Sequence, residues 1–320
     1  MNRFITIENK YLKVIISTLG AGIYQIYLKS DEEIPVLVTT SNPEDYLTSS
    51  NYYGKSIGRT SGRLFGPTYT LNQQSYPVEC NPNQSFMLHG GKQGIFAQTF
   101  EITTQKKNEV ILSYLDPASL TFPGDLFVHV LYRVMDKTLH IEYRANAVED
   151  TLCNLTNHTY FNLNIEGGTI LDHELMLNAD TYNVLDDHYR LIKQADVNDT
   201  PFDFKQLKRL RNGVLSLINT TQKGLDHCFI LNSNPLVGRL YDPKSKRGLN
   251  VYSDYPSVVI YTHNFSSKKA LNSSVPHGIH SSITFECQYE PDGIHHPELH
   301  SAILKKDEPY QHFIDFEFEF

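Results

Sequence analysis

A period of two in the hydrophobic pattern limits the folds open to this chain more than any other feature. Apolar residues occupy every second position in residues 128–134 and again in residues 139–143, with a turn signal at Asp136 and Lys137 between them. The same alternation returns in residues 314–320 at the C-terminus. Because neighbouring side chains of a strand point to opposite faces of a sheet, these segments predict a β-hairpin and a closing strand, each with one solvated face.

Helical patterning is sparse by comparison. Only residues 44–49, part of residues 201–210 and the segment after Pro297 are candidates for helices. Runs of strands without regular intervening helices predict an all-β fold, a sandwich or barrel of antiparallel strands. Proline, glycine and asparagine are spread through the whole chain as turn residues, without a repeat or a linker. We therefore predict a single domain over residues 1–320.

Composition narrows the range of ligands. The formal net charge of −8 argues against a nucleic-acid or anionic-membrane partner, both of which favour a basic face. The expected ligand is small and either neutral or modestly anionic. No segment has the length and apolarity of a membrane span, and the N-terminus lacks the features of a signal peptide. These features predict a cytoplasmic protein.

The cysteines also indicate a cytoplasmic protein. Cys80, Cys153, Cys228 and Cys287 are scattered without a CxxC spacing, which excludes zinc-ribbon and thioredoxin-like sites. Free thiols in a reducing environment are therefore expected.

The stretch NLTNHTYFNL, residues 154–163, contains the first candidate catalytic group, His158. It is too polar for a simple buried strand and too aromatic for a solvated loop, which favours the rim of a pocket. An imidazole near its unperturbed pKa of about 6.5 could give or take a proton at neutral pH. The alternative is a core histidine that bonds a backbone carbonyl.

The stretch ITFECQYEPD, residues 283–292, contains the second candidate. On a strand, Glu286 and Gln288 share one face, so a carboxylate and an amide would lie side by side. A buried glutamate has a raised pKa and is a plausible general base. The alternative is a glutamate that faces solvent.

Candidate binding residues lie in three further motifs. In KSIGRTSGRLF, residues 55–65, Lys55, Arg59 and Arg63 recur at every fourth position, and an arginine fork could bind sugar hydroxyls or carboxylates. A phosphate-binding loop is excluded, because Ser49 stands where its first glycine is required. The alternative for the whole segment is a solvated basic turn.

The other two motifs are LHGG, which contains His89, and GLDHCF, which contains Asp226. The glycines after His89 would let the backbone approach a ligand closely, and Asp226 could accept hydrogen bonds from a polyol. Both could equally be ordinary turn or cap residues. No metal site is expected near His295, His296 and His300, because their order differs from the HExxH motif.

Together these motifs resemble those of a known family. GRTSGRLFG, LHGGKQGIF, NHTYFNL, GLDHCFIL and FECQYEPD, in this order, are similar to the motifs of aldose 1-epimerases, the galactose mutarotase-like proteins, over nearly the whole chain. The resemblance implies a large single-domain antiparallel β-sandwich, the galactose mutarotase-like supersandwich, with few short helices. It also implies a metal-independent isomerase without cofactors that interconverts the α and β anomers of a free hexose such as galactose or glucose.

The resemblance extends to individual residues. Glu286 matches the catalytic base that takes the proton of the anomeric hydroxyl, and His158 matches the acid that protonates the ring oxygen. Substrate-binding roles are implied for Arg63, His89 and Asp226, and Gln288 is expected to line the pocket. The expected partner is a small-molecule sugar, without nucleic acid or membrane, and the protein is expected to be a monomer or homodimer.

Departures from the family pattern leave the substrate open. Gly62 stands where the family has asparagine, His263 where it commonly has glycine, and the chain has no tryptophan to stack on a sugar face. Three hypotheses follow: a mutarotase for a free aldose, an epimerase for a hexose 6-phosphate bound by the Lys55, Arg59 and Arg63 cations, and a non-catalytic sugar-binding or regulatory protein.

Overall fold

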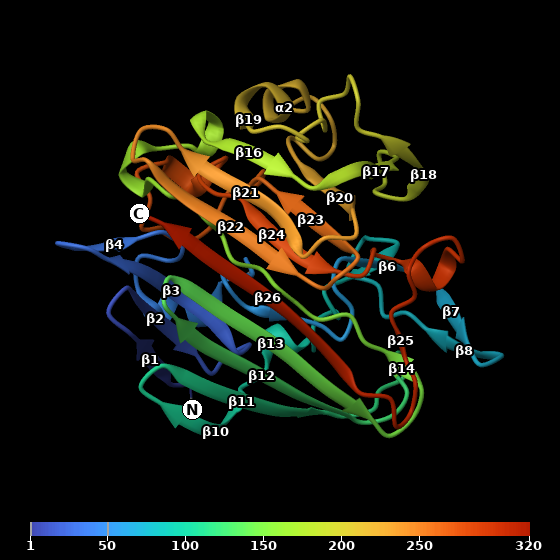
Figure 1. Ribbon diagram of the computed structural model, residues 1–320. Helices are drawn as coiled ribbons and strands as arrows, with labels where there is room; N and C mark the ends of the chain where they lie inside the picture. Colours follow the sequence, from blue (N-terminus) through green and yellow to red (C-terminus); the bar gives the residue numbers. More distant parts are fainter. Residues whose placement is uncertain (1, 50) are drawn as a thin grey trace.

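The fold is organised by one large antiparallel sheet in a computed structural model that describes residues 2–49 and 51–320 (Figure 1). The nine strands of this sheet are, in spatial order, β10 (Glu101–Lys106), β11 (Glu109–Asp116), β12 (Leu126–Met135), β13 (Thr138–Ala147), β26 (Tyr310–Glu319), β22 (Arg247–Ser253), β21 (Leu236–Asp242), β16 (Glu174–Leu177) and β19 (Lys208–Arg209).

Two smaller antiparallel sheets pack with it. The four-stranded sheet consists of β1 (Phe4–Glu8), β2 (Leu12–Ser17), β3 (Gly22–Lys29) and β4 (Glu33–Pro35). The five-stranded sheet consists of β18 (Leu191–Asp196), β17 (Ala179–Leu185), β20 (Asp226–Leu231), β23 (Ser257–Tyr261) and β24 (Thr284–Gln288). One continuous core contains buried side chains of all three sheets, such as Val14, Ile141 and Phe285. The fold is therefore the predicted antiparallel β-sandwich.

The remaining elements are short. Among the residues that the structure describes, four two-stranded ribbons pair β5 (Ser56–Ile57) with β15 (Thr156–Asn157), β6 (Arg63–Phe65) with β9 (Phe86–Leu88), β7 (Thr68–Leu71) with β8 (Gln74–Pro77), and β14 (Thr151–Leu152) with β25 (Ile303–Leu304). The helices are α1 (Pro43–Thr48), α2 (Leu210–Ser216), and the 3₁₀ turns η1 (Ile95–Ala97), η2 (Ile165–Gly167), η3 (Ile170–Asp172), η4 (Pro276–Gly278) and η5 (Gly293–His295). Within the described residues, no helix is long and apolar enough to cross a membrane.

The predicted hairpin and closing strand are confirmed. Met135 pairs with Thr138 at the end of the β12–β13 hairpin, and side chains along β12 alternate between buried and exposed. The C-terminal strand β26 lies between β13 and β22, where its apolar side chains Ile314, Phe316 and Phe318 are buried. The alternation appears because these strands bury one face and leave the other facing solvent.

The helix predictions were less accurate. Residues 44–49 nearly match α1, but α2 begins only at Leu210, where the second predicted segment ends. Phe202 and Phe204 instead bury side chains two positions apart, and Lys208–Arg209 pair with β16 as an edge strand. After Pro297, the described residues form turns and the short strand β25 rather than a helix, so that prediction was wrong.

Candidate functional site

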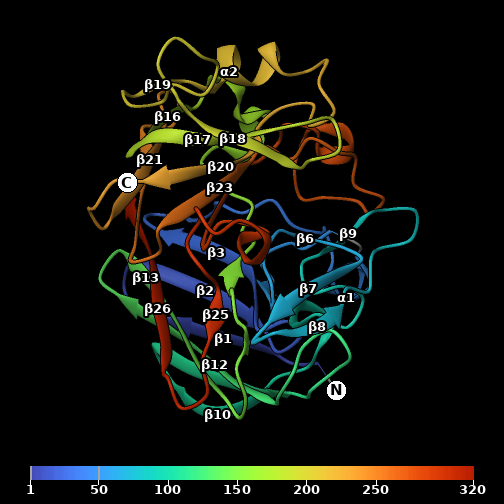
Figure 2. The ribbon, with the colours of Figure 1, turned by 90° about the vertical axis from the view of Figure 1, so that its right-hand side faces the viewer.

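A cavity of about 240 Å³ opens where the five-stranded sheet meets the β6–β9 ribbon and the segment after β15. Glu286, Asp226 and Tyr261 enter it from β24, β20 and β23, Arg63 enters from β6, and His158 follows β15. Ligand sites for drug-sized molecules commonly measure roughly 300–1,000 Å³, so a smaller cavity suits a ligand of about one sugar ring. Figure 2 shows the edge of the molecule on which β6, β9, β20 and β23 lie near one another.

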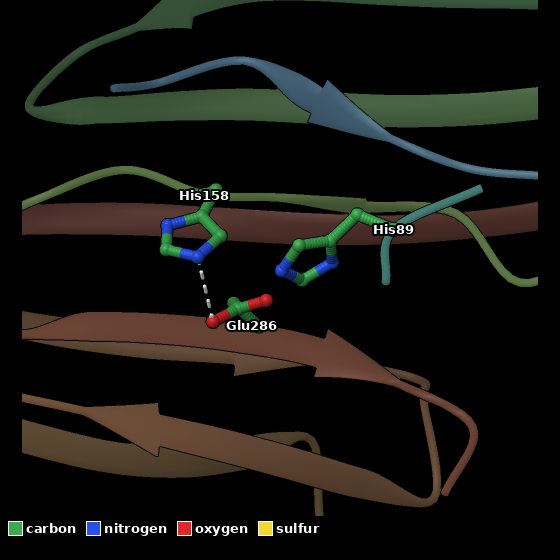
Figure 3. Close-up of side chains that lie close together, drawn as sticks. All are labelled: His89, His158 and Glu286. Atoms are coloured by element: carbon green, nitrogen blue, oxygen red, sulfur yellow. Dashed lines mark ion pairs between the residues drawn. The ribbon is translucent and has the colours of Figure 1, made fainter. Parts of the chain in front are cut away.

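His158 and Glu286 face each other in this cavity (Figure 3). His158 Nε2 lies 3.3 Å from Glu286 Oε1, and both side chains are buried. The backbone of His158 is fixed on both sides, because its N–H donates to the Lys55 carbonyl and its own carbonyl accepts from Gly54. Nε2 of the His158 ring thus faces a carboxylate in the cavity. The alternative of a core histidine that bonds a backbone carbonyl through Nε2 is therefore excluded.

Glu286 occupies the middle of β24, opposite Val259 of β23. The Thr284 hydroxyl donates a hydrogen bond of 3.2 Å to its Oε1. Burial, and to a lesser degree the nearby Asp226 charge, raise the pKa of Glu286 to about 8. The solvent-facing alternative is therefore wrong for this residue.

Burial raises the pKa of Glu286 but lowers the pKa of the two histidines of the cavity, His158 and His89. It lowers the pKa of His158 to about 3, and burial together with the neighbouring His158 holds the pKa of His89 well below its usual range. The expectation that His158 keeps a pKa near 6.5 is therefore corrected. Both shifts favour the uncharged form of the His158–Glu286 pair, in which a single shared proton lies on the carboxyl.

The same single proton also allows the opposite arrangement. A carboxylate facing an imidazolium has the same number of protons as a carboxylic acid facing a neutral imidazole. A ligand that offers a hydroxyl to Glu286 and an ether oxygen to His158 would stabilise the charged arrangement. The pair can then remove a proton from one oxygen while it delivers another proton to a second oxygen.

His89 adds a hydrogen-bond donor beside this pair (Figure 3). The Gly62 backbone N–H donates to His89 Nδ1 over 3.2 Å, so the neutral ring carries its proton on Nε2. The glycine after it has a different role from the one predicted. A Cβ on Gly90 would lie 2.2 Å from the Gly58 carbonyl, so Gly90 permits close packing of two backbone segments rather than approach of a ligand.

Arg63 and Asp226 form an ion pair on another side of the cavity. Arg63 Nη2 lies 3.0 Å from Asp226 Oδ2, and the guanidinium lies over the rings of Tyr189 and Phe86, at 3.8 and 5.4 Å from the ring centroids. Arg63 Nε is buried without a hydrogen-bond partner among the described residues. Arg63 as a residue lines the cavity wall.

Five of the six predicted site residues thus meet in one cavity, and Gln288 does not. Gln288 is fully buried and is absent from the cavity wall, where it was expected. Its amide donates to the Tyr289 carbonyl, and a Cβ on Gly62, a residue of the cavity wall, would lie 3.5 Å from Gln288 Nε2. Gln288 lies two positions from Glu286 on β24 and therefore shares its face of the strand, but it does not reach the cavity.

Lys55 and Arg59, which could have bound a phosphate, lie outside the cavity wall. Lys55 Nζ lies 5.3 Å from the centroid of the Tyr46 ring, and burial lowers the lysine pKa to about 8. Arg59 is buried against Asp116, with Nε–Oδ2 at 2.8 Å, and donates to several backbone carbonyls. The predicted cation cluster is therefore dispersed, with only Arg63 of the three at the cavity.

The aromatic lining of the cavity is not predicted by the sequence motifs. It consists of Tyr52, Phe65, Tyr160, Tyr189, Tyr261 and Phe265. The Tyr160 ring stacks on His158 with centroids 4.9 Å apart, and His263 packs behind Tyr160 at 5.1 Å. His263 therefore supports the wall that orients His158.

One group in the described part of the chain has a spacing that would also suit a metal ion. Donor atoms of His89, His158 and Glu286 all lie within 4.8 Å of one another. Two of these three groups, His158 and Glu286, already contact each other at 3.3 Å. The C-terminal histidines are engaged elsewhere, with His295 pairing with Asp292 and His300 with Glu290.

Comparison with known proteins identifies relatives over the full length. The family model described as Aldose 1-epimerase matches residues 3–317. The chain is similar to galactose mutarotase of Homo sapiens, with 32% identity over 98% of this chain and 92% of that protein. It is also similar to aldose 1-epimerase of Escherichia coli K12, with 28% identity over 99% of this chain and 95% of that protein.

Solved structures with the same fold are also found among known proteins. A GalM/aldose epimerase homologue from C. elegans superposes with a TM-score of 0.91 at 22% identity, covering 100% of this chain and 99% of that one. Galactose 1-epimerase from Lactobacillus acidophilus NCFM superposes with a TM-score of 0.84 at 26% identity, covering 100% and 98%.

Proposed function

Because the chain belongs to the aldose 1-epimerase family, we propose that its cavity binds a free aldose and that Glu286 and His158 carry out the proton transfers of anomer exchange. As a member of this family, the protein is an isomerase that interconverts sugar anomers. The observation that carries the site assignment is the 3.3 Å contact between His158 and Glu286, buried in a cavity the size of one sugar ring.

The proton balance of the pair fits this reaction. With sugar bound, the Glu286 carboxylate takes the proton of the anomeric hydroxyl while His158 delivers its proton to the ring oxygen. The bond between C1 and the ring oxygen breaks, which leaves an open-chain aldehyde, a protonated Glu286 and a neutral His158. After rotation about the C1–C2 bond, the reverse transfers close the ring on the other face of the aldehyde. The pair holds one proton before and after opening, once the sugar protons are counted.

The remaining polar groups fit a neutral polyol. Asp226 can accept from sugar hydroxyls, while the Arg63 guanidinium and His89 Nε2 can donate to sugar oxygens. A phosphate dianion would favour unpaired, clustered cations. Arg63 is the member of the predicted cluster that reaches the cavity, and Asp226 already pairs with it. These contacts favour a free aldose over a hexose 6-phosphate.

Polarimetry of freshly dissolved pure anomers tests the proposal. We expect the protein to speed equilibration of at least one free aldose, such as galactose or glucose, and to leave the corresponding 6-phosphates at the buffer rate. Binding of aldoses by calorimetry without any acceleration would support the non-catalytic alternative instead.

We expect anomer exchange to remain high through neutral pH and to fall about tenfold per unit above a pH of about 8. Because the pKa of Glu286 is raised to about 8, the pair keeps its single proton up to that pH and loses it above. Because the pKa of His158 is lowered to about 3, the second proton binds only near that pH. The measurement is kcat/KM against pH, with the spontaneous rate subtracted at every point. A midpoint near 6.5 would contradict this proton balance.

Lys55→Met should leave turnover of free aldoses unchanged and raise stability at neutral pH, on the order of 1–3 kcal/mol. Burial lowers the pKa of Lys55 from 10.5 to about 8, so the folded state disfavours its charge. Wild-type stability should therefore rise as the pH goes from about 8 toward 10.5, and the variant should lack this rise. Denaturation at pH 7 and pH 10 measures both effects.

Arg59→Met is the matched control for Lys55→Met. It removes a buried arginine from the same segment but leaves Asp116 without its partner, so it should destabilise the fold by about 3–5 kcal/mol.

A loss of turnover in Lys55→Met that is confined to sugar phosphates would instead support the hypothesis of a hexose 6-phosphate substrate.

A reducing cytoplasmic location and a single domain belong to the same proposal. Cys153, Cys228 and Cys287 are buried free thiols and Cys80 is a half-buried one, as suits a reducing compartment. The continuous core across three sheets favours one domain. A monomer or homodimer stays a prediction.

A further inference from the structure

The turn between β17 and β18, residues 186–190, has a tightly determined backbone at the edge of the five-stranded sheet (Figure 1). Asp186 Oδ1 accepts from the backbone N–H groups of His188 and Arg190, both at 2.8 Å. This arrangement holds Tyr189 at a φ of 65°. A bulky residue at positive φ is unusual and costs conformational energy, and such strain tends to persist where the residue has a functional task.

The Tyr189 side chain completes the enclosure of Arg63. Its ring lies 3.8 Å from the guanidinium carbon, Phe86 lies 5.4 Å away, and Asp226 pairs with the guanidinium edge at 3.0 Å. The Tyr189 hydroxyl donates to the Thr221 carbonyl at 3.3 Å, which ties the ring to a second segment. The guanidinium is thus restrained by two aromatic rings and one carboxylate.

The next residue of the turn makes a second contact with the same strand. The Arg190 guanidinium lies 4.2 Å from the centroid of the Phe65 ring, and Phe65 lies in β6 two residues after Arg63. Tyr189, Arg63 and Phe65 all line the cavity. Two consecutive residues of the turn therefore fasten the β17–β18 hairpin to β6 at the cavity wall.

We propose that Tyr189 is a positioning residue for sugar binding, which acts by holding the Arg63 guanidinium in place at the cavity wall. This inference rests on the proposed function of the cavity. A free arginine side chain loses rotamer entropy when it is fixed, and a site that fixes it in advance binds more tightly. The ring lies on the binding arginine, so its loss should weaken affinity rather than the proton transfers.

The test compares Tyr189→Ala, Tyr189→Phe and Tyr11→Ala, with KM and kcat measured on the aldose that the wild-type protein accelerates most. Tyr189→Ala should raise KM about 2- to 30-fold, the range of a cation–π contact, with kcat within about twofold. Tyr189→Phe keeps the ring face and should restore KM to near the wild-type value. Tyr11 is a half-buried tyrosine with Lys10 at 4.5 Å, outside the cavity wall, and its replacement should leave KM unchanged.

A double-variant cycle separates positioning from a merely structural effect. In an Arg63→Ala background, Tyr189→Ala should raise KM little further, because the group that it positions is gone. An unchanged KM in Tyr189→Ala, a fully additive loss in the Arg63→Ala background, or a Tyr189→Phe protein as weak as Tyr189→Ala would each overturn the inference.

Calorimetry with the same aldoses keeps this inference distinct from the proposed function. If the wild-type protein accelerates no aldose, the proposed function fails, yet a weaker affinity of Tyr189→Ala than of wild type would still support the role of Tyr189. A wild-type protein that neither accelerates nor binds any aldose would overturn both.

Discussion

Replacement of Glu286 by glutamine is expected to lower the rate of anomer exchange by about 10²- to 10⁴-fold while the protein still binds sugar. Glutamine keeps the shape of the side chain, and its amide oxygen can still accept the hydrogen bond from Thr284. It cannot take the proton of the anomeric hydroxyl, so ring opening loses its base. Polarimetry gives the rate, and calorimetry with the same aldose gives the affinity.

Glu290→Gln is the matched control for Glu286→Gln. Glu290 is also a buried glutamate just beyond the same strand, but it pairs with His300 and does not line the cavity. This control should retain wild-type exchange. Near-native exchange in Glu286→Gln, or an equal loss in Glu290→Gln, would refute the role of Glu286 as base.

The parts of the fold that the sequence predicts are those with one face in water. The strands β12, β13 and β26 alternate because each exposes every second side chain. By contrast, all five residues of β24 are buried, and so are four of the five in β23. Burial on both faces removes the alternation, so neither the pairing of β23 with β24 nor the placement of that sheet can be inferred from periodicity.

The residues of the site also differ in how far the sequence predicts them. Motif resemblance locates His158 and Glu286, but they are 128 positions apart in the sequence, and their contact depends on strand pairings far apart in the chain. The role of Tyr189 could not be predicted from the sequence. The chain has 20 tyrosines, and nothing in the residues around Tyr189 marks it as functional. Its role depends on where the hairpin tip meets β6.

Spacing was misleading in the segment that contains Lys55, Arg59 and Arg63. Residues four apart share a face on a helix, and this segment forms strands and turns instead. The three cations therefore point to three different partners: Tyr46, Asp116 and Asp226. Burial likewise decides the proton state of His158, and an isolated motif does not reveal burial.

His158→Gln should also lower exchange by about 10²- to 10⁴-fold, because glutamine can bond to Glu286 but cannot deliver a proton to the ring oxygen. Since base and acid act in one step on one sugar, losing both should cost little more than losing either alone. The variant that combines His158→Gln with Glu286→Gln should thus exchange anomers about as slowly as the worse single variant. Polarimetry on all three proteins measures this coupling.

His173→Gln is the matched control, because His173 is likewise buried and lies 3.9 Å from a carboxylate oxygen of Asp242. Burial lowers its pKa to about 4, in the same direction as that of His158, but it lies outside the cavity wall and accepts a hydrogen bond from the Leu163 backbone. Its replacement should lower the melting temperature and leave kcat nearly unchanged. If the two active-site losses instead multiplied in the double variant, His158 and Glu286 would act in separate steps, and the shared-proton mechanism would be wrong.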